Sequence, residues 1–364
     1  MNSRLYLEPV SFVSGAAARA LISSGDALPL AGPERAFTAI RIHRRTAVGG
    51  VDCTTTLPIT RLKDLGTERR RAADPALVAL QRQRPSFAGL APGRPAIMGV
   101  LNVTPDSFSD GGDFFDHARA VDRGLEMIAV GADIIDVGGE STRPGAAPVS
   151  EDEERRRVVP VVKALAEQGV LVSIDTRHAG VMRRAIDHGA RIVNDVSALT
   201  GDRDSLAVVA RSGASVVLMH MQGEPTTMQD SPRYNDVLTD VYDYLEARVA
   251  ACRDAGIDES RIAVDPGIGF GKTASHNLRL IEGLATFCAI GCAVVLGVSR
   301  KGFIGRIGNA PAAKNRLPGS LALALAGMER GADILRVHDV RETHQAVKLW
   351  RAVTLLTQGD DPSG

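Results

Sequence analysis

The sequence predicts an α/β protein that consists of a (β/α)8 TIM barrel with a small N-terminal α/β extension. From Ala96 onward, short β-branched runs alternate eight times with longer segments of helical period. Alternation of this kind is typical of right-handed βαβ units that build a parallel sheet. Eight such units over roughly 260 residues match the size of a closed barrel. An open, doubly wound sheet is the alternative, because the alternation alone does not show closure.

The predicted strands are apolar until their C-terminal ends, where each meets a polar residue or a polar loop. In chain order they read AIMGVLNVT, DIIDVGG, LVSIDT, RIVNDV, SVVLMH, IAVDPG, AVVLGVS and ILRVHD. The segments between them are amphipathic or Ala-rich, for example HARAVDRGLEMIAVG, HAGVMRRAIDHG and GSLALALAGMERG. Most of these segments end in Gly before the next strand, as helices often do. Each strand and the segment after it therefore predict one β/α unit.

Residues 1–92 differ in pattern, and we predict that they form an extension separate from the barrel at residues 93–364. They contain one predicted strand, from Phe37 to His43, and short helical stretches. The Pro/Gly-rich segment AGLAPGRP ends this region, with a composition typical of a boundary. The basic triplet at residues 69–71 could contact an anion, but one short cluster favours a solvated helical face. The pattern assigns no chemistry to this extension.

Composition excludes several classes of protein. The chain carries 43 Lys and Arg against 43 Asp and Glu, so it lacks the positive field typical of proteins that bind nucleic acid or anionic membranes. No apolar stretch approaches the roughly 18 residues that span a bilayer. Glu8 interrupts the apolar start of the chain, which argues against a secretory signal. Cys288 and Cys292 do not form a CxxC pair, so we expect reduced, buried thiols and a cytoplasmic protein.

Polar side chains at the strand ends predict the active site. In a barrel, the C-terminal ends of all strands open on one mouth, where barrel enzymes place their active sites. A cap or a turn explains one such residue easily, but ionisable groups at so many ends need partners. We therefore expect a polar ligand in the mouth. The residues at these ends are, in order, Asn102, Glu140, Thr142, Arg143, Asp175, Asn194, His220, Asp265, Ser299, Arg300, Lys301, Arg336 and His338.

The loops after the first two strands, NVTPDSFSDGG and GGESTRPGA, are long and rich in Gly, Pro, Ser and Asp. Such loops suit a mobile cover over a site. Arg143, Arg336 and His338 can meet at one edge of the mouth, where their donors suit phosphate oxygens. Asn102 and Asp106 offer hard oxygen ligands, as expected for magnesium (Mg2+) held mainly by a phosphorylated substrate.

At the centre of the mouth, Asp175, Asn194 and Asp265 supply acceptors and an amide. A ring with adjacent N–H donors, such as an aminopyrimidinone, would satisfy a carboxylate at two points. The nearby segment DPGIGFGKT looks like a phosphate-binding loop, but Pro266 stands where that motif requires its first Gly. The segment also fails GxGxxG, because Lys272 holds the third Gly position. Its glycines are therefore expected to shape the loop.

Eight segments, taken in order, resemble dihydropteroate synthase, an enzyme family of the folate pathway. They are MGVLNVTPDSFSDGG, DVGGESTRPGA, SIDT, VNDVSAL, MHMQGEPTTMQ, DPGIGFGK, GVSRKGFIG and RVHDV, and the resemblance covers about residues 95–356. The resemblance implies that the chain joins 6-hydroxymethyl-7,8-dihydropterin diphosphate to 4-aminobenzoate, with release of diphosphate and formation of 7,8-dihydropteroate. It also implies Mg2+ as the cofactor and a homodimer as the assembly.

The resemblance assigns roles to residues at matching positions. It places the pterin ring against Asp175, Asn194, Asp265 and Lys301. It places the diphosphate against Asn102, Thr142, Arg143, Arg336 and His338, with Mg2+ on Asn102. It places the aminobenzoate between Phe108, Thr142, Pro144 and Phe270. Many relatives have Ser after the motif lysine, whereas this chain has Gly302, which leaves a backbone N–H for the aminobenzoate carboxylate.

The residues and the resemblance imply the same mechanism. No Ser, Cys or Glu with an adjacent base is available as a covalent nucleophile. Mg2+, Arg143, Arg336 and His338 would stabilise the departing diphosphate. The pterin methylene then becomes electron-poor, and the negative Asp175 would favour that cation. We therefore expect an SN1-like substitution in which the catalytic residues are Asp175, Lys301, Arg336 and His338.

Three alternatives stay open at this point. A folate–corrinoid methyltransferase domain shares the pterin-facing Asp and Asn, but it needs no diphosphate clamp, and the RVHD and SRK segments argue against it. A lyase with a Schiff base on Lys301 needs a buried lysine, of which SRKG gives no sign. A non-catalytic pterin-binding paralogue is disfavoured by the retained residues Asn102, Arg143, Lys301, Arg336 and His338.

Overall fold

The computed structural model of the chain describes residues 4–46, 50–103, 113–140, 149–224 and 227–355. Eight parallel strands, β5 to β12, close into a barrel in which β12 pairs with β5. This closure confirms the predicted (β/α)8 TIM barrel and excludes the open sheet. The strands are β5 (Ala96–Asn102), β6 (Ile134–Gly138), β7 (Val172–Asp175), β8 (Ile192–Asp195), β9 (Ser215–Met219), β10 (Ile262–Asp265), β11 (Ala293–Leu296) and β12 (Ile334–Val337).

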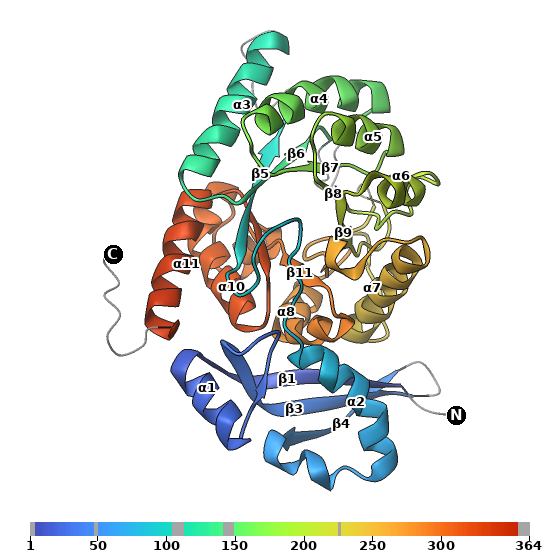
Figure 1. Cartoon of the computed structure of the whole chain (residues 1–364), viewed down its shortest axis with the longest axis vertical. Helices are drawn as coiled ribbons and strands as arrows, with labels where there is room; N and C mark the ends of the chain where they lie inside the picture. Colours follow the sequence, from blue (N-terminus) through green and yellow to red (C-terminus); the bar gives the residue numbers. More distant parts are fainter. Residues whose placement is uncertain (1–3, 47–49, 104–112, 141–148, 225–226, 356–364) are drawn as a thin grey trace.

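Helices follow the strands and surround the barrel (Figure 1). They are α3 (Asp113–Ala129), α4 (Glu151–Glu167), α5 (Ala179–Asp187), α6 (Ser205–Ser212), α7 (Val237–Asp254), α8 (Ala274–Glu282), α9 (Gly302–Ile307), α10 (Leu317–Glu329) and α11 (Val340–Leu355). Three short 3-10 turns join some of these elements, namely η3 (Glu259–Arg261), η4 (Leu284–Ile290) and η5 (Ala313–Arg316). At the start of α4, the Ser150 side chain accepts a hydrogen bond from the Glu153 backbone N–H, and acidic residues fill the first turn. Both features stabilise a helix N-terminus.

Apolar side chains fill the interior of the barrel. Every residue of β6, β8, β9, β10 and β11 is buried, because these strands have side chains inside the barrel and helices outside it. An eight-stranded barrel is just wide enough for its own side chains to fill. The interior layer includes Met98, Ile134, Ile192, Val217, Ala263, Val295 and Ile334. The polar residues of the mouth therefore lie on top of an apolar core.

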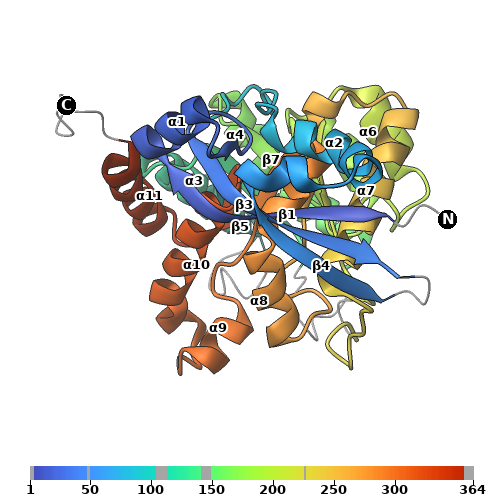
Figure 2. The same ribbon diagram turned by 90° about the horizontal axis from the view of Figure 1, so that it is seen from below.

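Four strands near the N-terminus form a separate antiparallel sheet beside the barrel (Figures 1 and 2). In this sheet, β1 (Leu5–Ser14), β2 (Leu28–Pro29) and β4 (Val51–Pro58) each pair with β3 (Arg35–Arg45). The unit is completed by α1 (Gly15–Ser24), η1 (Ile59–Asp64) and α2 (Thr67–Gln81). The predicted strand from Phe37 to His43 lies within β3, whereas the sequence pattern does not predict β1, β2 or β4.

The sheet is covered on both faces, which explains why β1 does not show a simple polar and apolar alternation. Leu7 is buried in the hydrophobic core, while its neighbours Tyr6 and Glu8 point to the opposite face and are buried as well. The Tyr6 hydroxyl donates to the Asp243 carboxylate of α7 at 2.8 Å. The polar face of the sheet therefore packs on the barrel helices through hydrogen bonds and ion pairs.

Glu8 lies at the centre of this junction between the sheet and the barrel. Its carboxylate accepts hydrogen bonds from Arg279 of α8 at 2.7 and 2.8 Å and from Arg41 at 3.1 Å. It also lies 2.5 Å from Nε2 of His43. Burial alone would raise the pKa of Glu8, but His43, Arg279 and Arg41 lower it to about 2. The buried negative charge is fully compensated.

Residues 82–95 cross the end of the barrel at which the strands begin (Figure 1). Phe87 belongs to the same cluster as Ala96, Ala293 and Ile334, which stand at or near strand starts. Arg84 is buried and donates to the carbonyl oxygen of Cys288 at 2.5 Å. The boundary at residue 92 stays a prediction, and the side chain of Phe87 packs with the barrel interior. Among the described helices, none is long and apolar enough to cross a membrane.

Candidate active site

One arginine joins two carboxylates at the barrel mouth. Arg336 of β12 donates through Nε to Oδ2 of Asp136 at 2.7 Å and through Nη2 to Oδ2 of Asp175 at 2.5 Å. Burial alone would lower the pKa of Arg336, but these two carboxylates raise it. Burial raises the pKa of Asp175. The Arg336 charge opposes this rise, and the Asp136 charge adds to it. The predicted residues Asp175 and Arg336 thus meet, although they are far apart in sequence.

Asp136 is a member of this cluster that sequence reasoning missed. It is fully buried in β6, and its Oδ2 accepts a second hydrogen bond from Nδ2 of Asn194 at 3.0 Å. Its Oδ1 has no hydrogen-bond partner among the described residues. The signal in the sequence is a carboxylate inside an apolar run, DIIDVGG, rather than at the end of the run. Asp136 therefore orients both Asn194 and Arg336.

Asp265 ends β10 at the same mouth and is 5% exposed. Its Oδ1 accepts a hydrogen bond from the backbone N–H of Gly267 at 2.7 Å. Burial raises the pKa of Asp265, while the Gly267 N–H, Lys301 and Arg336 oppose that rise. The Gly267 contact fixes one carboxylate oxygen, and the other oxygen remains available to a ligand.

Lys301 lies at the N-terminus of α9, close to the carboxylates. Its Nζ is 4.2 Å from the ring centroid of Phe270, which is a cation–π distance. Desolvation and the Arg336 charge lower the pKa of Lys301 to about 8, while Asp265 and Asp175 oppose the change. Phe270 thus contacts the lysine of the mouth, and its ring is 8% exposed.

His338 follows β12 and is held by Ser299. The Ser299 hydroxyl lies 3.1 Å from the His338 backbone nitrogen, whose N–H it accepts, and 3.1 Å from Nδ1 of the ring. Burial and the charges of Arg336, Arg300 and Lys301 lower the pKa of His338 to about 3, so the imidazole is neutral. In the tautomer in which the Ser299 hydroxyl donates to Nδ1, the ring proton is on Nε2. His338 then offers one N–H donor to an anion.

Asn102 lies beside Asp175 at the end of β5. A Cβ placed on Gly138 would be 3.8 Å from Oδ1 of Asn102 and 3.7 Å from Oδ2 of Asp175, so the two side chains converge over this glycine. No cluster of three or more His, Cys, Asp or Glu among the described residues could hold a metal ion. A divalent cation at Asn102 would therefore need most of its ligands from a substrate.

Several predicted site residues cannot be placed. Phe108, Thr142, Arg143 and Pro144 lie outside the described residues, as does Asp106. Of the predicted aminobenzoate pocket, the structure therefore describes Phe270 alone. Of the predicted diphosphate site, it describes Asn102, Arg336 and His338.

Near the end of β6, helix α4 contributes a buried glutamate that the sequence pattern does not mark. Glu154 of α4 is fully buried, and neither carboxylate oxygen has a hydrogen-bond partner among the described residues. Its Oε2 lies 3.9 Å from Nε2 of His178. Burial raises the pKa of Glu154 to about 8, with Glu140 and Asp175 adding to the rise. This carboxyl group is therefore protonated at neutral pH.

His220 differs from the other residues at the strand ends. Its ring packs edge-on against Tyr244 of α7 at 4.9 Å between centroids. Its Nδ1 lies 3.0 Å from Nζ of Lys272, which is also buried. The expectation that His220 faces the mouth with the other strand-end residues is not met, because the ring packs against the helical layer.

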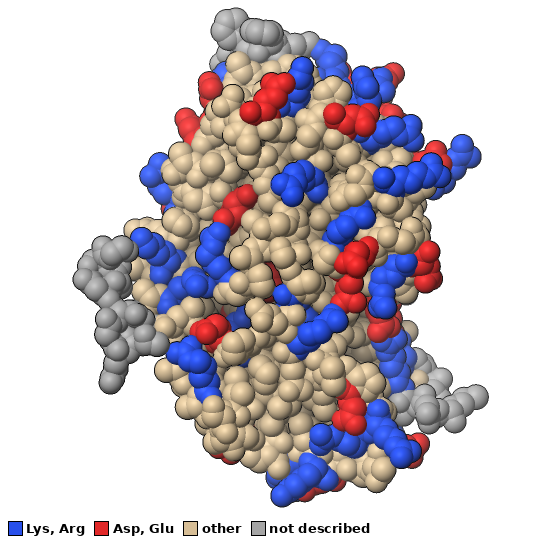
Figure 3. All heavy atoms as spheres, in the orientation of Figure 1, with Lys and Arg blue, Asp and Glu red and all other residues tan. Residues whose placement is uncertain are grey.

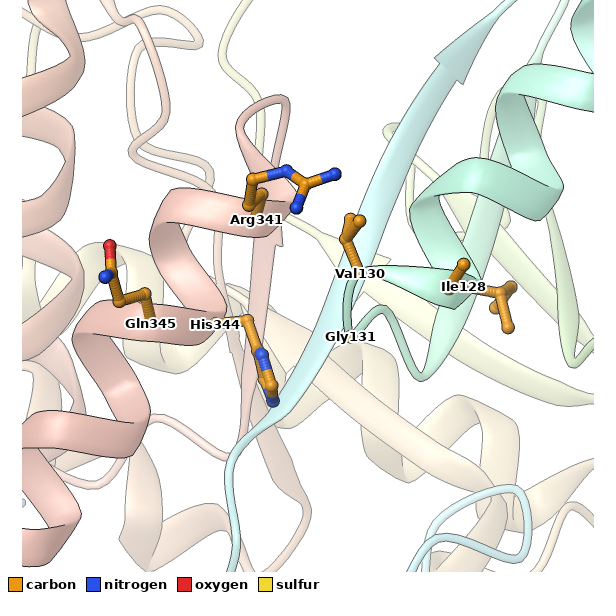
Figure 4. Close-up of a pocket in the computed structure, with 7 residues that line it drawn as sticks. Ile128, Val130, Gly131, Arg341, His344 and Gln345 are labelled. Atoms are coloured by element: carbon orange, nitrogen blue, oxygen red, sulfur yellow. The ribbon is translucent and has the colours of Figure 1, made fainter. Parts of the chain in front are cut away.

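The outer surface has hollows that are separate from this site. One of about 490 Å³ lies between the end of α3 and the start of α11, with His344 pointing toward Gly131 (Figure 4). It contains none of the predicted site residues. On the face shown in Figure 3, blue and red side chains are interspersed, so this face has no extended patch of one sign.

Comparison with known proteins agrees with this geometry. Residues 98–338 match the family model described as pterin binding enzyme. The dihydropteroate synthase of Escherichia coli K12 is 48% identical over 259 residues, which cover 71% of this chain and 91% of that protein. A Xanthomonas albilineans dihydropteroate synthase structure with 4-aminobenzoic acid is 44% identical with a TM-score of 0.70, and covers 75% of this chain and 99% of that one.

Another structure of the Xanthomonas albilineans enzyme, in complex with 7,8-dihydropteroate, is 42% identical with a TM-score of 0.66. It covers 72% of this chain and 95% of that one. These matches include the barrel strands that carry Asp136, Asp175, Asn194, Asp265 and Arg336. The chain belongs to the pterin-binding enzyme family and, within it, to the dihydropteroate synthases.

Proposed function

We propose that the mouth joins 6-hydroxymethyl-7,8-dihydropterin diphosphate to 4-aminobenzoate, which gives 7,8-dihydropteroate and diphosphate. The observation that carries this proposal is the convergence of Asp175, Asn194, Asp265, Lys301 and Arg336 on one mouth. Relatives with this fold have been solved with 4-aminobenzoic acid and with 7,8-dihydropteroate, which supports the two substrates.

In this proposal the pterin ring binds between carboxylates and a cation. Asp265 accepts hydrogen bonds from the ring amino group and from N3–H, because the Gly267 N–H holds Oδ1 and leaves Oδ2 for the ligand. Lys301 donates to the acceptor side of the ring, and Phe270 steadies its ammonium group. Asn194, fixed by Asp136, meets a further edge of the ring. A ligand with fewer polar edges would leave these buried groups unpaired, at a cost of roughly 1–3 kcal/mol each.

The diphosphate would lie on the side of Arg336 and His338. Arg336 uses Nε and one Nη2 hydrogen on the two carboxylates, so it keeps further N–H donors for a ligand. His338 adds its Nε2–H. We assign Asn102 as the protein ligand for Mg2+, which fits its hard amide oxygen and the lack of a larger ligand cluster among the described residues. When bound, Mg2+ would neutralise part of the diphosphate charge.

The proposed chemistry is an SN1-like substitution. Arg336 and His338 stabilise the charge that grows on the departing diphosphate. Asp175 faces the electron-poor methylene, and its contact with Arg336 holds its carboxylate in place. Lys301 keeps the ring oriented while the amine of 4-aminobenzoate attacks. An aromatic amine is a weak base, so no strong general base is required.

A coupled assay for diphosphate release tests this function. Release should require 4-aminobenzoate, and chelation of Mg2+ should reduce it. Asp265→Ala should weaken binding of the pterin diphosphate by roughly 1–3 kcal/mol or more, because it removes a charged acceptor from a buried pair. Binding without release would identify a non-catalytic paralogue, and a borohydride-trapped adduct on Lys301 would identify a lyase.

We further propose that the protein works in the cytoplasm as a homodimer. The small-molecule substrates support the first statement, since they belong to a biosynthetic reaction. Sedimentation equilibrium would test the second, and a concentration-independent monomer would contradict it.

A further inference from the structure

Lys272 is a buried cation outside the set of residues assigned to the substrates. It belongs to the DPGIGFGK segment and is 1% exposed. Its Nζ lies 2.9 Å from the carbonyl oxygen of Phe270, 3.2 Å from the carbonyl oxygen of His220 and 3.0 Å from Nδ1 of His220. An ammonium group has a donor for each of these acceptors, whereas a neutral amine has one donor too few. The geometry therefore fits the charged form.

His220 is built to accept from Lys272. Burial and the nearby lysine charge lower the pKa of His220 to about 2, so its ring is neutral. Because Nδ1 accepts from Lys272, the ring proton is on Nε2. Burial and Lys301 in turn lower the pKa of Lys272 to about 7, and Asp265 opposes that change. The charge of Lys272 thus depends on Asp265.

Two glycines allow the loop after β10 to lie directly on the loop after β9. A Cβ on Gly267 would lie 1.9 Å from the carbonyl oxygen of His220, and a Cβ on Gly271 would lie 2.3 Å from the carbonyl oxygen of Gln222. Both glycines have positive φ, +68° and +60°. Lys272 crosses this contact, because it bonds Phe270 on one loop and His220 on the other.

The charge of Lys272 is close to Asp265. Gly267 donates its N–H to Asp265 Oδ1 at 2.7 Å, and a Cβ on the same glycine would lie 3.3 Å from Nζ of Lys272. The cations that face Asp265 are Lys301, Arg336 and Lys272. Arg336 is already bonded to two other carboxylates, and Lys301 is stacked on Phe270. Of these three cations, Lys272 is therefore the one that lies beside the Gly267 contact of Asp265.

We propose that Lys272 is a positioning residue of the pterin site, which ties the β10–α8 loop to the β9–α7 loop and keeps Asp265 ionised. This inference rests on the proposed role of Asp265. Through the Phe270 carbonyl, Lys272 also holds the ring on which Lys301 is stacked. We assign it no contact with either substrate.

The test compares Lys272→Met with Lys272→Arg and with the control Lys348→Met, which removes an exposed lysine of α11. Affinity for 6-hydroxymethyl-7,8-dihydropterin diphosphate with Mg2+ is measured by calorimetry from about pH 5 to about pH 9. Loss of a cation raises the pKa of Asp265, so in Lys272→Met the acid-side loss of affinity should move to higher pH by about one unit. On the acid limb, affinity at a fixed pH should fall about tenfold, with KM for the pterin rising more than kcat falls.

Lys272→Arg should restore the pH profile, and Lys348→Met should match the wild type. A folded Lys272→Met protein with unchanged affinity and acid limb would overturn the inference. If both Lys272 variants fail to fold, the wild type still decides: calorimetry in two buffers near pH 6 with 6-hydroxymethyl-7,8-dihydropterin, which has no titrating diphosphate, should show no proton release, because in this proposal Lys272 keeps Asp265 ionised. Release of one proton would overturn the proposal. If the wild type does not bind the pterin diphosphate at all, the proposed function fails instead.

Discussion

Glu8 at the sheet–barrel junction and Glu154 beside the mouth are both fully buried, but their environments are opposite. Glu8 is paired with His43, Arg279 and Arg41, which hold its pKa near 2. Glu154 has no hydrogen-bond partner among the described residues, and its pKa is raised to about 8. The same side chain is thus ionised in one region and protonated in the other. Its neighbours decide the outcome, since burial raises the pKa at both positions.

The two regions also use arginine differently. At the junction, Arg279 serves a carboxylate whose hydrogen bonds are complete. At the mouth, Arg336 is shared by Asp136 and Asp175, and one oxygen of Asp136 has no partner among the described residues. Unsatisfied buried polar groups are rare in proteins and concentrate at functional sites. The junction holds the sheet against the barrel, whereas the mouth keeps polar atoms that a ligand can bind.

Arg336→Met should have the largest effect on activity. It removes the donor that the proposed mechanism directs at the departing diphosphate, and loss of one such donor typically lowers kcat by about 10²–10³. Steady-state kinetics of diphosphate release measures this change. A variant that folds and keeps the wild-type kcat would show that Arg336 does not stabilise the departing diphosphate.

Arg279→Met makes the same substitution at the junction and should affect stability instead. It leaves the buried Glu8 with fewer partners, which should lower the free energy of unfolding by roughly 3–5 kcal/mol. Because Arg279 lies on α8 away from the mouth cluster, kcat should stay within about twofold of the wild type. Urea unfolding and the diphosphate assay together check both statements. Equal free energies of unfolding for the variant and the wild type would show that the Glu8–Arg279 pair does not stabilise the fold.

The free energy of unfolding should fall in acid because Glu8 becomes protonated there. Its folded pKa lies below its unfolded value, so its stabilisation is present above about pH 5 and is lost as the pH falls toward 2. The full contribution is roughly 3 kcal/mol. Glu8→Gln should therefore be much less stable than the wild type near neutral pH, and the gap should narrow on acidification. A gap that stays constant with pH would contradict an ionised Glu8.

Glu154→Gln should change the pH dependence of stability in the opposite sense. The folded pKa of Glu154 lies above the unfolded value, so the stability that it contributes is present below about pH 4.5 and is lost as the pH rises toward 8. The neutral amide avoids that loss. The variant should therefore match the wild type in acid and exceed its stability at about pH 8, as measured by urea unfolding. A variant that becomes relatively less stable as the pH rises would show that Glu154 is ionised.

The barrel could be predicted from sequence because each β/α unit is local. Strands buried on both faces are short apolar runs, and their helices end in Gly, so the pattern repeats within each unit. In the N-terminal sheet, β1 contains Glu8 and Pro9 among apolar residues, and its polar face is buried against α7 and α8. That contact joins residues more than 230 positions apart, and a local pattern does not contain it.

The candidate site was predictable where a polar residue ends a strand. Asp175 and Asp265 follow this rule, and Arg336 stands one residue before the end of β12. The structure brings the three together. Asp136 does not follow it, because it lies within an apolar run and its partners Asn194 and Arg336 come from other strands. Lys272 stands in a motif that does not match a phosphate-binding loop, and nothing in that motif shows that the lysine is buried.

Residues 82–95, which cross the end of the barrel at which the strands begin, affect how a fragment of this protein should be designed. A cut at the compositional boundary near residue 92 would discard Phe87, an aromatic ring that packs with the first residues of β5, β11 and β12. It would also discard Arg84, which caps the carbonyl of Cys288. An autonomous catalytic fragment would therefore have to begin upstream of Arg84, so that this segment is expressed together with the strands it covers.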